Sequence, residues 1–195
     1  ALLSALVPAP TGYGVFMRTN QEFAWAELAA DGVVRTGPLA LDSGRVNSLR
    51  GVWRDDRYQL AFMRREAGRA YAYAGAVHQR AVEGVQRLQP DNAGTEEQQP
   101  LLAVTAEGTR WYAWRQGRAL ALGSTVDGAV RPLIHELPSI PTPLGLWVDD
   151  ETQYILHQTD GQTRVEHFAG GAHQRTQTFA PADAADVYSG PEGTF

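Results

Sequence analysis

The chain has 195 residues and a formal net charge of −5. No apolar run approaches the roughly 20 residues of a membrane-spanning helix, and the acidic balance argues against a nucleic-acid partner. The chain has no cysteine, and all 17 basic residues are arginine. This composition removes disulfides, thiolate nucleophiles, cysteine-bound metals and lysine-anchored cofactors, so we expect no cofactor.

The first ten residues hold a short apolar stretch without a basic flank, so we interpret it as a strand instead of a signal sequence. The sequence begins with Ala instead of Met. That start fits an exported protein, periplasmic or extracellular, and it equally fits a segment cut from a longer chain. Export is the working hypothesis for its location.

One spacing of large apolar residues recurs four times along the chain. Each copy reads as an apolar strand, a polar turn, and a strand with large residues two apart, which is typical of a hairpin. We place the repeats near 13–49, 50–100, 101–143 and 144–179. The large residues occupy matching positions: Phe23 and Trp25, Leu60 and Phe62, Tyr112 and Trp114, Tyr154 and Leu156. We expect these four places to be structurally equivalent.

A third and a fourth strand follow in the later copies, after turns that contain Gly or Asp. The third strand alternates through Tyr71 and Tyr73 in one copy and through Leu120 and Leu122 in the next. Repeat starts lie about 40 residues apart, close to the length of a four-stranded propeller blade. No segment keeps a helical stripe free of Gly and Pro over three turns, so the predicted fold class is all-β.

This spacing resembles the blades of bacterial β-propeller repeat proteins, over roughly residues 13–179. The resemblance implies about four antiparallel blades and says little about activity, because propellers carry many functions. The first blade is expected to be irregular and to lack one strand, since Trp25 lies only six residues before Asp31. Residues 2–7 look like the outer strand of a preceding blade that closes a ring. An unrelated extension, or a larger ring completed by another segment, are the alternatives.

Two segments fall outside the pattern. Residues 89–100 are polar and acidic, which predicts a mobile connection between the second and third blades. Residues 180–195 are rich in Ala, Asp, Gly and Pro and read as a C-terminal tail or docking segment.

Candidate binding residues cluster near the turns between second and third strands. Arg64 and Arg65 in one blade, with Arg115 and Arg118 in the next, could recognise carboxylate or phosphate groups. Solvated charge on an exposed hairpin is the competing interpretation. Trp111 has no aromatic counterpart in the other copies, so it is the best candidate for an exposed aromatic side chain.

Two acidic pairs, Asp55 with Asp56 and Asp149 with Asp150, occupy matching turns. Oxygen-rich turns can hold calcium, but each pair lacks further ligands, and Asp is expected at hairpin turns for its local hydrogen bonding. We therefore favour turn formation over metal binding. The five histidines show no ligand spacing, and neither a zinc-protease motif nor a serine nucleophile elbow is present.

The leading hypothesis is a non-catalytic binding or assembly subunit whose partners are proteins or other subunits, with no nucleic acid and no membrane span. The alternative is a carbohydrate-binding or carbohydrate-active propeller, either a lectin or a glycosidase. A third hypothesis is a fragment of a larger processed enzyme whose catalytic residues lie elsewhere.

Overall fold

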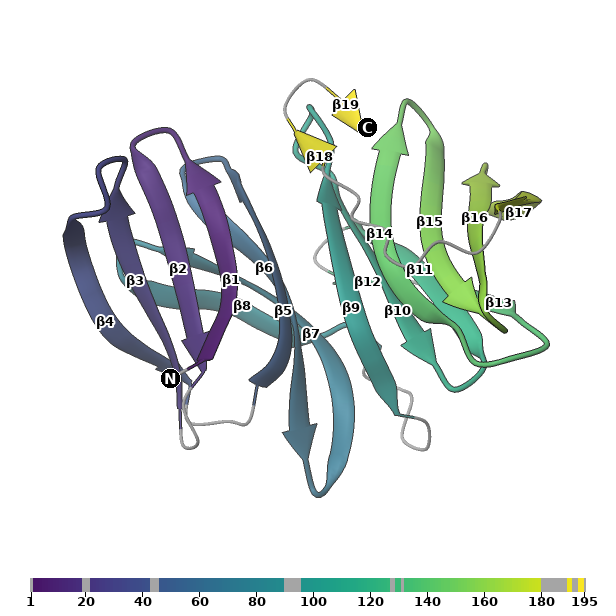
Figure 1. Cartoon of the computed structure of the whole chain (residues 1–195), viewed down its shortest axis with the longest axis horizontal. Helices are drawn as coiled ribbons and strands as arrows, with labels where there is room; N and C mark the ends of the chain where they lie inside the picture. The colour runs from purple at the N-terminus through teal and green to yellow at the C-terminus, as the bar shows by residue number, and fades with distance from the viewer. Residues whose placement is uncertain are drawn as a thin grey trace. The chain divides into compact units, whose positions relative to one another are not determined.

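The computed structural model describes residues 2–18, 22–42, 46–89, 96–126, 129–130, 132–179, 189–190 and 193–194. Within these residues every regular element is a β-strand, and every strand pairs antiparallel with its neighbours (Figure 1). The chain divides into two compact units, Ala1–Pro90 and Asp91–Phe195. None of the described elements is a helix that is long and apolar enough to cross a membrane.

The first unit contains two four-stranded sheets, each built from consecutive strands. Sheet 1 consists of β1 (Leu2–Ala9), β2 (Gly12–Arg18), β3 (Phe23–Ala29) and β4 (Val34–Asp42). Sheet 2 consists of β5 (Val46–Arg54), β6 (Arg57–Glu66), β7 (Arg69–His78) and β8 (Ala81–Arg87). The first strands of the two sheets, β1 and β5, are neighbours. A shared core of Phe16, Trp25, Tyr58, Leu60 and Phe62 lies between the sheets.

The second unit repeats this arrangement. Sheet 3 consists of β9 (Glu97–Val104), β10 (Arg110–Gln116), β11 (Ala119–Val126), β12 (Ala129–Val130) and β13 (Leu133–Glu136). Both β12 and β13 pair with β11, so they share the place of the fourth strand. Sheet 4 consists of β14 (Thr142–Asp149), β15 (Thr152–Thr159), β16 (Gln162–Ala169) and β17 (Ala172–Phe179). A core that includes Leu101, Leu120, Ile155 and Phe168 joins sheets 3 and 4.

The predicted third strands are confirmed: Tyr71, Tyr73, Leu120 and Leu122 lie on β7 and β11 and are buried. The predicted all-β class of antiparallel four-stranded sheets is confirmed as well. Gly170 and Gly171 form the turn from β16 to β17, with φ angles of 58° and 73° that glycine adopts without strain. Asp127 and Gly128, a residue pair that favours a tight turn, lie outside the described residues.

The first repeat needs a correction, because it does not lack a strand. Residues 2–9 form β1, which pairs with β2 from Ala9 opposite Gly12 back to Leu2 opposite Arg18. They are therefore the first strand of sheet 1 and not the outer strand of a preceding blade. The irregularity lies elsewhere, in three register shifts along the β3 and β4 ladder.

The four repeat positions are also not equivalent. Phe23 lies on the third strand of its sheet, whereas Leu60 lies on the second. In sheet 2 Arg54 pairs with Arg57 across the turn, and in sheet 4 Asp149 pairs with Thr152. Ile155, and not Tyr154, therefore matches Leu60, and Tyr154 points to the opposite face because side chains alternate along a strand.

The two irregular segments are only partly described. Residues 97–100 belong to β9, and Glu97 is fully buried, so the predicted connection ends earlier than expected. Residues 90–95 lie outside the described residues, as do 180–188. Within the tail, β18 (Ser189–Gly190) and β19 (Gly193–Thr194) form a short antiparallel pair.

Candidate functional site

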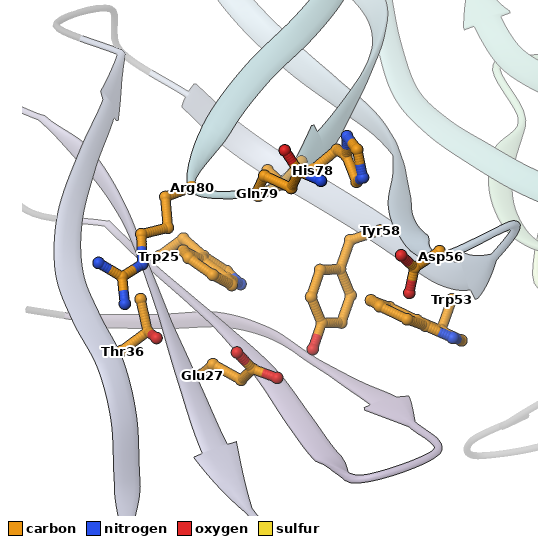
Figure 2. Close-up of a pocket in the computed structure, with 10 residues that line it drawn as sticks. Trp25, Glu27, Thr36, Trp53, Asp56, Tyr58, His78, Gln79 and Arg80 are labelled. Atoms are coloured by element: carbon orange, nitrogen blue, oxygen red, sulfur yellow. The ribbon is translucent and has the colours of Figure 1, made fainter.

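A pocket of about 280 Å³ opens between sheets 1 and 2 of the first unit (Figure 2). Its aromatic wall comes from three strands: Trp25 on β3, Trp53 on β5 and Tyr58 on β6. Apart from Val77, the rest of the lining is polar and consists of Glu27, Thr36, Asp56, His78, Gln79 and Arg80. The volume falls just below the range of about 300–1,000 Å³ that is common for small-molecule sites.

The aromatic wall is held together by ring contacts. The Tyr58 ring lies edge-on to Trp53, with centroids 4.6 Å apart, and it is tilted against Trp25 at 6.0 Å. Phe16 supports Tyr58 from behind, at 5.7 Å. Because Tyr58 is only 2% exposed, this packing fixes its ring and aims its hydroxyl.

Two hydrogen-bond donors of this wall lack a partner among the described residues: the Trp25 indole Nε1 and the Tyr58 hydroxyl, both buried. Figure 2 shows the Tyr58 hydroxyl on the side of the pocket where Glu27 lies. Burial, together with the nearby Glu27 carboxylate, raises the pKa of Tyr58 to about 12, so the hydroxyl stays protonated at neutral pH. Unsatisfied buried donors are rare in native proteins and call for a structural or functional reason.

Two tight turns that line the pocket have unusual backbone conformations. Asp55 and Asp56 join β5 to β6 with φ angles of 53° and 59°, and Gln79 and Arg80 join β7 to β8 with 46° and 72°. Among the described residues these are the only consecutive non-glycine pairs with positive φ. Such turns normally use glycine, so side chains are retained here against a conformational cost.

The predicted arginines of the first unit lie at the other end of sheet 2. Arg64 and Arg65 are at the end of β6, next to the turn into β7, whereas the pocket lies at the turns from β5 to β6 and from β7 to β8. The Arg64 guanidinium lies 3.7 Å from the Glu66 carboxylate and 5.9 Å from the centroid of the Tyr73 ring. Arg65 is exposed.

The other predicted residues lie in the second unit. Arg115 and Arg118 flank the turn from β10 to β11, and Arg118 donates a hydrogen bond to the carbonyl of Pro138. Trp111 lies at the opposite end of β10 and is half-buried against the core of sheets 3 and 4. The structure therefore does not join Trp111 and these two arginines in one site.

Three of the four acidic residues lie in turns, whereas Asp149 is the last residue of β14 and pairs with Thr152, so the two acidic pairs do not occupy matching positions. Asp55 and Asp56 form the tight turn described above, and Asp150 also has a positive φ, of 49°. Within the described part of the chain the only group of three possible metal ligands lies elsewhere, at His135, Glu166 and His173. Although the histidines show no ligand spacing in sequence, strand pairing and sheet packing bring three of them, His135, His157 and His173, to the one carboxylate of Glu166.

Sequence reasoning missed most of the pocket, including Glu27, Tyr58, Gln79 and Arg80. One signal was available: Asp-Asp and Gln-Arg stand between strands at positions where Asn-Gly or Asp-Gly is usual. This signal marks the two turns of sheet 2, but it does not indicate that both turns line one pocket with residues of sheet 1.

No protein-family model matches the chain, and no curated protein matches it. Solved structures do. An endo-arabinase from Bacteroides thetaiotaomicron aligns at 12% identity and a TM-score of 0.61, over 98% of this chain and 86% of that one. TolB from Acinetobacter baumannii aligns at 10% identity and 0.58, over 95% and 44%.

Puromycin hydrolase aligns at 17% identity and a TM-score of 0.57, over 99% of this chain and 35% of that one. This chain therefore spans less than half the length of TolB and of puromycin hydrolase. At these identities the likeness establishes the fold alone, which is that of β-propeller domains. The same fold occurs in proteins with quite different activities.

Proposed function

We propose that the chain is a carbohydrate-binding protein whose ligand, about one sugar ring in size, occupies the pocket between sheets 1 and 2. The observation that carries this proposal is the pairing of an aromatic wall with charged side chains, Glu27, Asp56 and Arg80, in one pocket. We therefore favour the carbohydrate hypothesis over the protein-partner hypothesis. The protein partner stays a prediction.

The chemistry of a sugar matches both halves of the lining. A pyranose presents an apolar C–H face, which packs on an aromatic ring such as Trp53. Its hydroxyls both donate and accept, so they can donate to the carboxylates of Glu27 and Asp56 and accept from the Arg80 guanidinium. Hydrogen bonds to charged groups are about twice as strong as neutral ones, so the acidic side chains would fix the ligand's orientation.

Glycoside hydrolysis is a second candidate, because two carboxylates line the pocket. Glu27 and Asp56 come from different sheets and lie on different sides of Tyr58 in Figure 2. Glycosidases use two such acids around the scissile bond. Turnover of a chromogenic glycoside that is lost in Glu27→Gln would support this candidate over binding alone.

A glycan array followed by calorimetric titration of the best ligand tests the proposal. We expect Trp53→Leu and Asp56→Asn each to weaken binding at least about tenfold, since each removes a direct contact worth more than about 1 kcal/mol. Glu151→Gln is the matched control, because Glu151 occupies the same turn position in sheet 4 as Asp56 does in sheet 2. No glycan binding, or binding unchanged by both pocket variants, would overturn the proposal.

A further inference from the structure

A second polar cluster lies in the second unit, where the outer part of sheet 3 meets sheet 4. It gathers His135 from β13, Glu166 from β16 and His173 from β17. The Glu166 side chain is fully buried, whereas the side chains of His135 and His173 are 21% and 27% exposed. The cluster is therefore anchored in the core but open to solvent on one side.

Both imidazoles point the same nitrogen at the same carboxylate oxygen. The Nε2 atom of His173 lies 2.8 Å from Glu166 Oε2, and the Nε2 atom of His135 lies 3.7 Å from it. The two rings are stacked, with centroids 4.1 Å apart and planes 19° apart. The three possible ligand atoms all lie within 4.8 Å of one another.

We propose that His135, Glu166 and His173 form a binding site for one divalent transition-metal ion of the zinc class. Zinc bonds to nitrogen and oxygen are about 2.0–2.2 Å long, so two ligands in tetrahedral geometry lie about 3.3 Å apart. The two Nε2 to Oε2 separations of 2.8 and 3.7 Å lie on either side of that value. Small side-chain rotations would bring all three atoms to bonding distance.

The ligand set selects the class of metal. Imidazole nitrogen suits zinc, copper, nickel and iron, whereas calcium and magnesium prefer sites built from oxygen alone. Two histidines with one carboxylate leave a fourth tetrahedral position, and the exposed edges of His135 and His173 leave it open to solvent. Water would occupy that position.

The surroundings of Glu166 orient the carboxylate as second-layer partners of a metal site do. His157, fully buried on β15, lies with Nε2 2.9 Å from Glu166 Oε1, so it holds the oxygen that does not face the other histidines. The Thr176 hydroxyl donates to Oε2 at 2.6 Å. Such outer partners fix the ligating group, and their loss commonly lowers metal affinity 10- to 100-fold.

The competing explanation is a hydrogen-bond network that only fastens β17 and β13 to the core. Zinc titration of the full chain by calorimetry, after chelator treatment and its removal, separates the two. We expect one zinc ion per chain, and at least about tenfold weaker binding in His135→Gln and in His173→Gln, since a direct ligand should matter no less than an outer partner. Glutamine keeps a hydrogen-bond donor for Glu166 but has no imidazole nitrogen.

His167→Gln is the matched control, because His167 is on the same strand as Glu166 but contacts Tyr154 on the opposite face. It should leave zinc binding unchanged. No zinc uptake, equal uptake by both ligand variants, or equal affinity for magnesium or calcium would overturn the proposal. If His173→Gln fails to fold by circular dichroism, His135→Gln decides, together with the visible spectrum of cobalt bound to the unaltered chain.

Discussion

Asp56 and Arg80 lie on two adjacent turns of sheet 2, both with left-handed backbone, at φ angles of 59° and 72°. Both side chains line the same pocket. A left-handed conformation costs a residue with a side chain about 1–2 kcal/mol relative to glycine. The two turns therefore trade stability for the groups that they present, which is a common feature of functional sites.

Replacing Arg80 by Gly should stabilise the fold and weaken ligand binding. Removing the side chain relieves the positive φ, and we expect a gain of about 1 kcal/mol and a rise in melting temperature of about 2–4 °C. Ala67→Gly is the control, because Ala67 has a φ of 48° in the turn at the other end of sheet 2. It should stabilise equally and leave glycan affinity unchanged. If Arg80→Gly and Ala67→Gly bind the glycan with equal affinity, the Arg80 side chain does not contribute to binding and the prediction is wrong.

The stability of the protein should fall as pH rises through the range where Tyr58 ionises. Its pKa is about 12 in the folded chain, against the ordinary tyrosine value of 10, so the folded state favours the protonated hydroxyl. That contribution is complete below pH 10 and is lost as pH rises toward 12.

Chemical denaturation between pH 8 and 11.5 measures this dependence. In Tyr58→Phe the free energy of unfolding should fall less steeply as pH rises above 10. Part of the decline should remain, because burial also raises the pKa of Tyr73 and of Tyr112. An identical slope in the variant and the parent would contradict the assignment of Tyr58 as a buried, neutral phenol.

Gly14→Ala should distort the aromatic wall from behind. A Cβ atom at Gly14 would lie 2.5 Å from the nearest atom of the Tyr58 ring, a distance that real side chains do not adopt. Overpacking of this kind costs about 1–3 kcal/mol, and a displaced Tyr58 should also lower glycan affinity. In Gly75→Ala, where the nearest atom is 3.4 Å away, both quantities should stay near their original values. If Gly14→Ala changes neither stability nor glycan affinity, the Tyr58 ring is not fixed in place.

Trp114→Ala and Tyr154→Ala should differ in cost, although both residues belong to the repeated set of large apolar side chains. Trp114 is fully buried, so its truncation should destabilise by about 3–5 kcal/mol. Tyr154 is half-buried and stacks on Trp147 with centroids 5.1 Å apart, so about 1–2 kcal/mol is expected. Urea unfolding measures both. A larger loss for Tyr154 would mean that its face is covered more completely than the structure indicates.

The sequence predicted the all-β fold and most of the strands, because alternating large residues and glycine turns act locally. Strand register was harder to predict. Tyr154 and Leu60 share a sequence spacing, yet a one-residue difference in position relative to the turn places them on opposite faces. The first repeat was misplaced for a related reason, since the apolar pattern of Val15 to Trp25 falls on the second and third strands.

The candidate sites were largely beyond sequence reasoning, because they form between sheets. Glu27 and Tyr58 are 31 positions apart and meet only when sheet 1 packs on sheet 2. His135 and His173 approach Glu166 from strands of two different sheets. Local periodicity predicts which face of a strand is buried, but it does not predict which polar side chains will converge across two such faces.

Because β1 is the first strand of its own sheet, none of the four main sheets in the described part of the chain depends on a strand from a distant part of the sequence. Every main sheet of the described structure is made from neighbouring stretches of sequence, so its hydrogen bonds close short loops and can form early in folding. The loss or duplication of one whole sheet would leave the backbone pairing inside the others intact. Such a chain can grow or shrink in modules of about 40 residues.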